Sequence, residues 1–481
     1  MPWKLEITTF DVGQGDSSFI KTWNEDTKEC KTVLIDGGQK KYASNILKNL
    51  KNLCKDTSGN IIPVDRIIIT HFDKDHAGGI VDLLRWAILS SSCHELKGYL
   101  KEELEKIKEI EKIKDLSVNL LKEAITRTFP DLNFKGLDKS DQNKNKRIRE
   151  YLLTEMNRQK VHQLQQFYKT IDETIFGLFE RKDHHTGTLF ETTKIYSLEL
   201  ETTSYSGGDE MRRQLNIISK EKKVEFNSYK FYSKNFKSFI QEKLLNLDVL
   251  WNSGAVPAGT PTMKIIAANG TAASDKVNDN NLSIAILLTL NNFRYYSGGD
   301  LESIVEDKVV KQTLSAFKCS HHGSDLSTSE NFLKKSKPKV AIVSAGIPFD
   351  DNGEEIPDTA DSDPNHRLPN KNAMERLKNS PDVQMVYLTG CANPDLNDMI
   401  INKDQVKALG HKFRVAGAKW EKGVTKDGKS YAAANYPGDI ILRYSGGQVF
   451  TIEYAEAEDV DPNNNTIRVV NKSLITTYQV Q

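Results

Sequence analysis

The densest group of reactive side chains lies in one short segment, Thr70–Gly79, which reads THFDKDHAGG directly after an apolar, strand-like run. An imidazole and a carboxylate two positions apart on an extended chain can face the same side, so His71 and Asp73 can share one metal ion. Asp75 and His76, at the turn into the next helix, can hold a second ion. The segment therefore predicts part of a metal site.

Hydrolases with two metal ions hold them roughly 3.5 to 4 Å apart around a bridging hydroxide, which the metals make available by lowering the pKa of water toward about 7. Four side chains cannot complete two such sites, so further ligands must come from later in the chain. The alternative is a loop of solvated charges. The metal site is favoured because the group follows a β-branched strand and precedes Gly78 and Gly79.

Alternating strands and turns are expected on both sides of a long segment of different composition. In the first part, strands are predicted at Leu5–Phe10, Ser17–Lys21, Thr32–Ile35 and Arg66–Thr70, and helices near Ala43–Leu53 and from Gly79 onward. Residues 95–247 are rich in Lys, Glu and Leu at helical spacing, and strand texture returns at Met263. The predicted organisation is a first half-domain at 1–94, a mostly helical insertion at 95–247, a second half-domain at 248–455 and a tail at 456–481.

The bulk composition excludes several classes of protein. Lys plus Arg and Asp plus Glu both total 66, so the net charge does not attract the chain to nucleic acid or to an anionic membrane. The five cysteines are scattered without CxxC spacing, which argues against a disulfide framework and a zinc knuckle. No signal peptide and no apolar run of roughly 18 residues is evident. We expect a soluble cytoplasmic protein without membrane association.

Five further motifs accompany the opening segment. They are Phe10–Asp16 (FDVGQGD), Leu34–Gly38 (LIDGG), Ser297–Glu302 (SGGDLE), Ser320–Ser324 (SHHGS) and Pro338–Ser344 (PKVAIVS). In this order the set resembles the metallo-β-lactamase superfamily, whose signature is HxHxDH at the end of a strand. It is most similar to the branch with the soluble hydrolase domain of the DNA-uptake protein ComEC and the phosphorylcholine esterases, where the signature often reads HxDxDH. The resemblance implies an α/β (αββα) sandwich with a large helical insertion.

The resemblance also implies a set of metal ligands. His71 and Asp73 would bind one ion, and Asp75 and His76 the other. Asp300 matches the aspartate that bridges both ions. One of His321 and His322 would be the late histidine ligand and its neighbour would contact the phosphate or the bound hydroxide, and the sequence does not decide between them.

Two departures from the family pattern bear on the metal. Many members place a histidine ligand roughly twenty residues before the bridging aspartate, where this chain reads Asn278–Ser283. Asn281, Asp279 or water would have to fill that position. A carboxylate at Asp73 in place of imidazole makes the site harder, which shifts the preference from zinc toward manganese or magnesium. The expected cofactors are two divalent ions, Zn²⁺ or Mn²⁺.

Several residues have both a functional and a structural interpretation. Asp16 is placed to orient a ligating histidine, while Asp11 and Asp36 fit either a supporting role or a plain turn. His366 resembles a late family histidine and would act as a general acid or contact phosphate, or else lie on an exposed loop. Asp209 repeats the YSGGD motif but lacks the following histidines, so we do not expect it to bind metal.

The sequence favours a binuclear-metal hydrolase that cleaves phosphodiester bonds, with DNA or RNA as the preferred substrate. Asp75 and Asp300 would hold the bridging hydroxide, and His322, its neighbour or His366 would donate a proton or contact the phosphate. Basic stretches at 139–160 and 414–431 are candidates for nucleic-acid contact. The alternatives are hydrolysis of a small ester (a phosphocholine-like phosphoester, a lactone or a thioester) and a scaffold or effector that binds a protein partner through the insertion. The oligomeric state stays open.

Overall fold

The computed structural model describes part of the chain. The described residues are 3–56, 59–85, 193–198, 209–220, 225–229, 259–268, 278–346, 368–390, 410–416, 438–456 and 472–480, with short pieces at 189–190, 418–420, 423–424, 430–431 and 434–436. The chain divides into two compact units, one formed by 1–46, 64–81 and 193–481, the other by 47–63 and 82–192. Everything below concerns the first unit.

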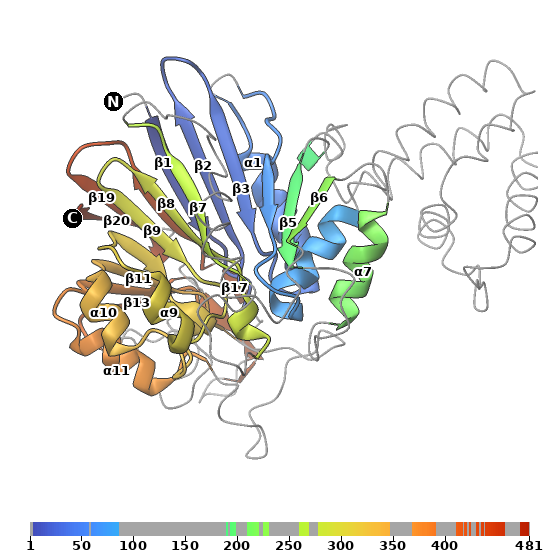
Figure 1. Cartoon of the computed structure of the whole chain (residues 1–481). Coiled ribbons are helices and arrows are strands. Elements are labelled where there is room, and N and C mark those ends of the chain that lie inside the picture. The colour runs from blue at the N-terminus through green and yellow to red at the C-terminus, as the bar shows by residue number, and fades with distance from the viewer. Residues whose placement is uncertain are drawn as a thin grey trace, which may run out of the picture. The chain divides into compact units, whose positions relative to one another are not determined.

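The first sheet has nine strands in the order β20-β19-β18-β1-β2-β3-β4-β5-β6 (Figure 1). Their bounds are β1 Trp3–Thr9, β2 Ser18–Asn24, β3 Cys30–Ile35, β4 Arg66–Ile68, β5 Lys194–Leu198, β6 Glu225–Tyr229, β18 Ile440–Tyr444, β19 Val449–Glu456 and β20 Lys472–Gln479. The strands from β20 to β3 pair antiparallel, and those from β3 to β6 pair parallel. The first and last parts of the chain thus build one mixed sheet.

The second sheet has seven strands in the order β13-β12-β11-β10-β9-β8-β7. Their bounds are β7 Thr262–Ala267, β8 Ala285–Leu290, β9 Phe293–Ser297, β10 Ala316–Lys318, β11 Val340–Val343, β12 Met385–Leu388 and β13 Phe413–Val415. β9 to β13 are parallel, whereas β7 and β8 form an antiparallel edge. The parallel strands are buried along their length, as strands covered on both faces must be.

Three helices cover the second sheet: α9 (Ser303–Val309), α10 (Glu330–Ser336) and α11 (Lys371–Asn379). They bury apolar residues at helical spacing against the strands, among them Val305, Phe332, Leu333, Met374 and Leu377. Ser329 and Asn370 cap the last two helices by accepting hydrogen bonds from backbone N–H groups of the first turn.

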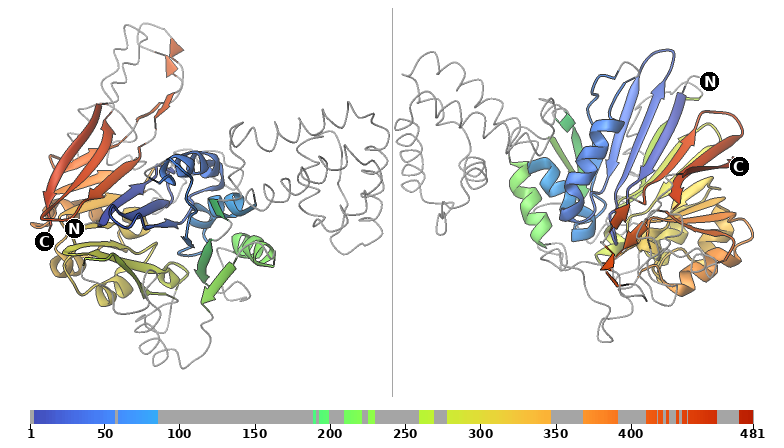
Figure 2. Two further views of the ribbon diagram at one scale, coloured as in Figure 1. Left: turned by 90° about the horizontal axis from the view of Figure 1, so that it is seen from above. Right: turned by 180° about the vertical axis from the view of Figure 1, so that it is seen from behind.

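The two sheets pack face to face (Figure 2), and aromatic side chains from both sheets meet between them. The rings of Phe293 and Tyr444 stack with centroids 5.1 Å apart, and Tyr387 meets Tyr454 edge-on at the same distance. Aromatic rings bury a large apolar area at such contacts. The predicted sandwich is confirmed in its two mixed sheets with helices.

The chain re-enters the first sheet within the segment that the sequence assigned to the insertion. β5 and β6, with α7 (Asp209–Ser219) between them along the chain, extend the first sheet beyond β4. The chain rejoins the first unit at Thr193, whereas the sequence placed the end of the insertion at residue 247. The predicted helices at 95–192 and the basic stretch at 139–160 lie outside the described residues.

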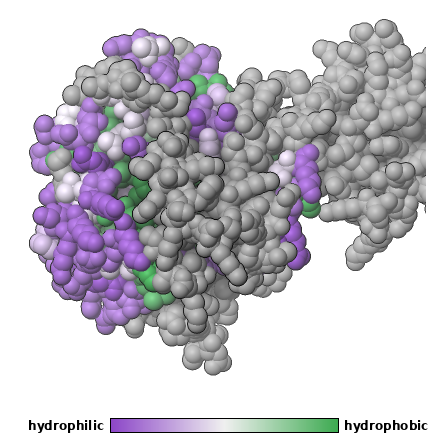
Figure 3. Space-filling model, viewed as in Figure 1, coloured by the Kyte–Doolittle hydropathy of each residue, from purple (hydrophilic) through white to green (hydrophobic). Residues whose placement is uncertain are grey.

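The surface of the described residues is mainly hydrophilic in the view of Figure 3, with small hydrophobic areas between. None of the helices that could be searched is both long and apolar enough to cross a lipid bilayer.

Candidate metal centre

The candidate residues gather where strands of both sheets end. Asp36 follows β3, the segment Thr70–His76 follows β4, Asp300 follows β9, the pair His321–His322 follows β10, and Ser344 follows β11. Sites in sheets of this kind form outside the carboxyl ends of parallel strands, because the loops from several strands converge there. Segments more than 200 residues apart in the chain therefore meet at one edge.

A helix begins at residue 74, earlier than the prediction at Gly79. The backbone N–H groups of His76 and Ala77 donate to the carbonyl of Asp73 at 3.0 and 2.8 Å. Asp75 and His76 therefore lie in the first helical turn. Apolar periodicity could not show this start, because the first turn is polar.

Glycines let the loops after β1 and β3 come close to the helix that begins at residue 74. A Cβ on Gly15 would lie 2.6 Å from the carbonyl oxygen of Asp75, which also accepts a hydrogen bond from the N–H of Asp16 at 3.0 Å. A Cβ on Gly79 would lie 1.9 Å from the carbonyl oxygen of Gly37. Only glycine fits at either position, so these residues fix where the metal-binding segment lies.

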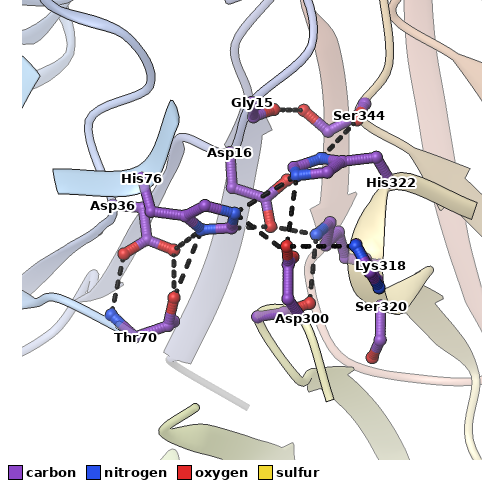
Figure 4. A network of polar contacts seen from close by, with 12 residues as sticks. Gly15, Asp16, Asp36, Thr70, His76, Asp300, Lys318, Ser320, His322 and Ser344 are labelled. Atoms are coloured by element: carbon purple, nitrogen blue, oxygen red, sulfur yellow. Dashed lines mark hydrogen bonds and ion pairs between the residues drawn. The ribbon is translucent and has the colours of Figure 1, made fainter. Parts of the chain in front are cut away.

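The imidazole of His76 is held by Asp36 (Figure 4). Its Nδ1 donates to the carboxylate of Asp36 at 2.9 Å, and the same carboxylate accepts from the N–H and the hydroxyl of Thr70 at 2.8 and 2.7 Å. A carboxylate can only accept here, so Nδ1 carries the proton. The Nε2 atom of His76 is left with a bare lone pair, the form that binds metal.

His322 is fixed in the same way by a different acceptor. Its Nδ1 donates to the carbonyl oxygen of Ser344 at 2.9 Å, while the hydroxyl of Ser344 donates to the carbonyl of Gly15 at 2.6 Å. Asp16 lies 3.3 Å from the same Nδ1 and is ion-paired with the buried Lys318. Nε2 of His322 is again the bare nitrogen.

The two bare nitrogens point at each other. The Nε2 atoms of His76 and His322 are 3.2 Å apart, and Asp300 lies 3.2 Å from the first and 3.5 Å from the second. Asp75 lies 3.3 Å from the Nε2 atom of His322. When both rings are neutral, two lone pairs at this distance repel unless a cation lies between them, and both rings are almost completely buried. This set fits a metal ion.

A second set of residues also lies near Asp300. The Nε2 atom of His71 is 3.5 Å from Asp73 and 3.8 Å from Asp300, and that of His321 is 3.9 Å from Asp300. The Nδ1 of His71 contacts the hydroxyl of Ser283 at 3.3 Å. Two of these ring nitrogens, Nε2 of His71 and Nδ1 of His321, are buried without a hydrogen-bond partner among the described residues. Such nitrogens are costly unless a ligand satisfies them.

The charges of the cluster are strongly coupled. Burial disfavours the imidazolium form, yet the carboxylate of Asp300 and the aspartates beside it raise the pKa values of His76 and His322 well above their usual range. Burial likewise opposes ionisation of Asp300, but the histidines around it hold its pKa well below normal. The buried carboxylates therefore favour positive charge beside them. A divalent cation bound to the Nε2 atoms would supply that charge in place of the imidazolium protons.

The structure brings together every predicted ligand. These are His71, Asp73, Asp75, His76, Asp300, His321 and His322. Liganding atoms of Asp16, His76, Asp300 and His322 all lie within 4.8 Å of one another. Asp16 joins this group by distance, but it pairs with Lys318 and faces the proton-bearing Nδ1 edges of the rings.

Other predicted candidates lie elsewhere. The side chain of Asn281 is occupied, because its amide donates to Asn278 and Glu302 at 2.7 and 2.8 Å and its oxygen accepts from the N–H of Glu302. Asp11 has a structural contact, accepting from the N–H groups of Gly13 and Gly438 at 3.2 and 3.0 Å. His366 lies outside the described residues.

Four supporting residues were missed in the sequence: Thr70, Ser283, Lys318 and Ser344. Lys318 left a signal, since a lysine inside the apolar strand β10 must have a buried partner. Ser344 left none, because its contribution is a backbone carbonyl that any residue carries.

Comparisons with known proteins agree with this geometry. A family model described as "Metallo-beta-lactamase superfamily" matches residues 11–151. Over 78 residues the chain is 35% identical to ComE operon protein 3 of Bacillus subtilis (strain 168), which is 15% of this chain and 10% of that protein. The chain thus matches about a tenth of that relative's length.

One crystal structure, the metallo-beta-lactamase fold protein YhfI from Bacillus subtilis, aligns over 81% of this chain and 98% of that one. The TM-score is 0.31 and the identity 8%, too low to carry an argument. The family match over residues 11–151 and the buried ligand set lead to one conclusion: this part of the chain is similar to the metallo-β-lactamase superfamily, and the described residues form a buried cluster of aspartates and histidines that fits a metal ion.

Proposed function

We propose that this protein is a binuclear-metal-dependent hydrolase that cleaves phosphodiester bonds. The observation that carries the proposal is the pair of ligand sets that both contact Asp300. Each set consists of two imidazoles and a carboxylate, and the carboxylate of Asp300 faces both. Such an arrangement suits two ions that act together on one phosphate.

The distances support a division into two sites. Ligand atoms about 2.0 to 2.2 Å from one tetrahedral ion lie roughly 3.3 to 3.6 Å apart. Asp75, His76 and His322 form the first set. The Nε2 atoms of the two histidines lie 3.2 Å apart and 3.2 and 3.5 Å from Asp300, and Asp75 lies 3.3 Å from that of His322. We name it the inner set.

His71, Asp73 and His321 form the outer set. His71 lies 3.5 Å from Asp73, and His71 and His321 lie 3.8 and 3.9 Å from Asp300. His321 supplies the imidazole that the segment 278–283 lacks. A carboxylate at Asp73 makes this set richer in oxygen than a three-histidine site, which favours Mn²⁺ beside Zn²⁺.

When bound, two such ions would polarise the phosphate and lower the pKa of a shared water toward about 7. The protein's part is to fix the tautomer of His76 and His322 with the proton on Nδ1, through Asp36 and Ser344, so that Nε2 faces the other ligands. It also buries the two imidazoles of the inner set, while Asp73 and Asp75 keep side-chain exposures of 35% and 23%. Substrate can therefore reach the carboxylates from solvent.

The structure also bears on which histidine moves a proton. His322 is 1% exposed and both its nitrogens have partners in the cluster or at Ser344, which suits a ligand better than a proton donor. The role of general acid or phosphate contact thus stays with His366 in our proposal.

Nucleic acid is the favoured substrate on the resemblance to the ComEC-type branch, and a small phosphodiester is the next choice. The test offers purified protein with Mn²⁺ or Zn²⁺ four substrates: linear DNA, single-stranded RNA, cyclic dinucleotides and bis(p-nitrophenyl) phosphate. Asp75→Ala and His76→Ala should abolish cleavage. His411→Ala, which removes a histidine from an exposed turn, should leave it unchanged.

Metal-dependent cleavage of the synthetic diester together with DNA or RNA would support the proposal. Binding of two ions without cleavage of any phosphodiester would contradict it. In that case hydrolysis of a carboxylic ester or thioester, or a role as an effector, becomes the better account.

A further inference from the structure

The turn that carries the late histidines has an unfavourable backbone. His321 has φ 52° and ψ 45°, His322 has φ 51° and ψ 24°, and Gly323 continues with φ 79°. The left-handed region is readily accessible to glycine but disfavoured for other residues, and two in succession are rare. The direction of the His322 ring depends on this backbone, so surrounding contacts must hold it in place.

One buried carboxylate contacts both ends of the segment that contains the turn. Glu306 lies on α9 and is completely buried. Its Oε1 accepts from the hydroxyl of Ser320 at 2.8 Å, and its Oε2 accepts from the backbone N–H of Thr328 at 2.7 Å. Ser320 is the residue directly before His321, and Thr328 is the last residue before the cap of α10.

Nothing in the described part of the chain neutralises this carboxylate. No ion pair joins Glu306 to a lysine or arginine there, and burial raises its pKa to about 7. A buried, unpaired carboxylate generally costs stability compared with an apolar side chain of similar size. Besides the hydroxyl of Tyr296, it contacts Ser320 and Thr328 at the two ends of the segment that contains the turn, which points to a task there.

We propose that Glu306 is a positioning residue for the inner set: it ties Ser320 to Thr328 and so holds the His321–His322 turn in the conformation that aims Nε2 of His322 at Asp75, His76 and Asp300. The inference rests on the proposed metal function. Glu306 touches neither metal ligand nor substrate and acts through Ser320 and the backbone.

A purely structural role would have a different consequence. If Glu306 only stabilised the fold, its loss would lower the melting temperature. Its effect on metal affinity would then be no larger than that of any other equally destabilising substitution. If it positions the turn, the affinity of the inner set should fall by the roughly 10- to 100-fold that is typical when an outer partner of a metal ligand is removed.

Three variants separate these cases. Glu306→Leu removes both acceptors. Glu306→Gln keeps the shape, because its amide oxygen can accept from Thr328 while its NH₂ group donates to the Ser320 hydroxyl. Leu442→Ala is the matched control: it opens a cavity in the first sheet, where Leu442 is fully buried and pairs with Ile7 and Ile452.

The measurement is titration of metal-free protein with Zn²⁺, and separately with Mn²⁺, by calorimetry, beside a thermal melt. Glu306→Leu should bind the more tightly held ion at least tenfold more weakly than wild type. The affinity of Glu306→Gln should stay within about threefold of wild type. Leu442→Ala should bind metal like wild type although its melting temperature is lower. If Glu306→Leu fails to fold, Glu306→Asp takes its place, because its shorter side chain cannot span both donors. Tenfold weaker metal binding by Glu306→Asp would support the inference.

Two results would overturn it. Unchanged affinity in Glu306→Leu or Glu306→Asp, with a wild type that binds two ions, would reject the positioning role alone. A wild type that binds no ion would reject the proposed function together with this inference.

Discussion

The inner and outer sets differ in how firmly they are held, although they share Asp300. In the inner set, His76 and His322 are at most 1% exposed and each Nδ1 donates to a group that can only accept, a carboxylate or a backbone carbonyl. In the outer set, Nδ1 of His71 contacts hydroxyl groups. The His321 side chain is 21% exposed, and its buried Nδ1 has no hydrogen-bond partner in the described part of the chain.

The difference teaches that preorganisation, rather than ligand count, separates the two sets. Each offers two imidazoles and one carboxylate, but only the inner histidines have ring orientations fixed by an acceptor. A fixed ligand loses less freedom on binding metal, so we expect the inner set to bind its ion first and more tightly.

The largest effect is expected from the residue that the sets share. Asp300→Ala removes the carboxylate that faces both ions, so both affinities should collapse and hydrolysis should fall by ~10³-fold or more. Metal content per chain and turnover of bis(p-nitrophenyl) phosphate measure this. If Asp300→Ala retained one tightly bound ion, the inner set would not depend on the shared aspartate.

The two neighbouring histidines should have unequal effects. His322→Ala removes an inner ligand and should abolish the tighter binding step. His321→Ala should weaken only the second step, by about tenfold, because its contact with Asp300 is long at 3.9 Å. Calorimetric titration resolves the two steps, and equal losses from both variants would remove the distinction between the sets.

The residues that contact the Nδ1 atoms of the histidines should show the same difference between the two sets, with smaller effects on metal affinity. Asp36→Ala frees the proton on Nδ1 of His76 and should weaken the inner ion by roughly 10- to 100-fold. Ser283→Ala on the outer side removes a contact of 3.3 Å to His71 and should cost only a few-fold in the second step. A larger effect of Ser283→Ala would reverse the ranking.

The smallest effect on activity is expected from Glu306→Gln, whose consequence appears instead in stability. Burial raises the pKa of Glu306 to about 7 from an ordinary 4.5, so the folded protein binds a proton more tightly than the unfolded chain. The wild type therefore loses stability as the pH rises from about 4.5 to 7, whereas Glu306→Gln lacks this loss. The difference should reach roughly 3 kcal/mol at pH 7 in urea unfolding curves. If the free energies of unfolding of the two proteins changed in parallel between these pH values, the raised pKa of Glu306 would be contradicted.

Much of the fold was predictable because alternation and periodicity report burial directly. The strands around Leu5–Phe10 and Thr32–Ile35 and the helix α1 (Ala43–Leu53) lie within a few residues of the prediction. The return to the first sheet through β5 and β6 was placed in the insertion instead, since strand pairing across more than 100 residues leaves no local pattern.

The candidate site was predictable in its ligands but not in their environment. Histidine and aspartate spacing, with the family resemblance, singled out all seven residues that the structure brings together. The choice between His321 and His322 depends on left-handed backbone angles, and the roles of Ser344, Lys318 and Glu306 depend on long-range contacts. Of these, only Lys318 leaves a mark in the sequence, as a lysine inside the apolar strand β10.

Anomalous diffraction from crystals of the full chain grown with Mn²⁺ tests the central claim most directly. The account predicts two peaks: one among Asp75, His76 and His322 and a weaker one among His71, Asp73 and His321, with Asp300 between them. A single peak on the Asp16 side, or no peak within the cluster at saturating metal, would contradict it.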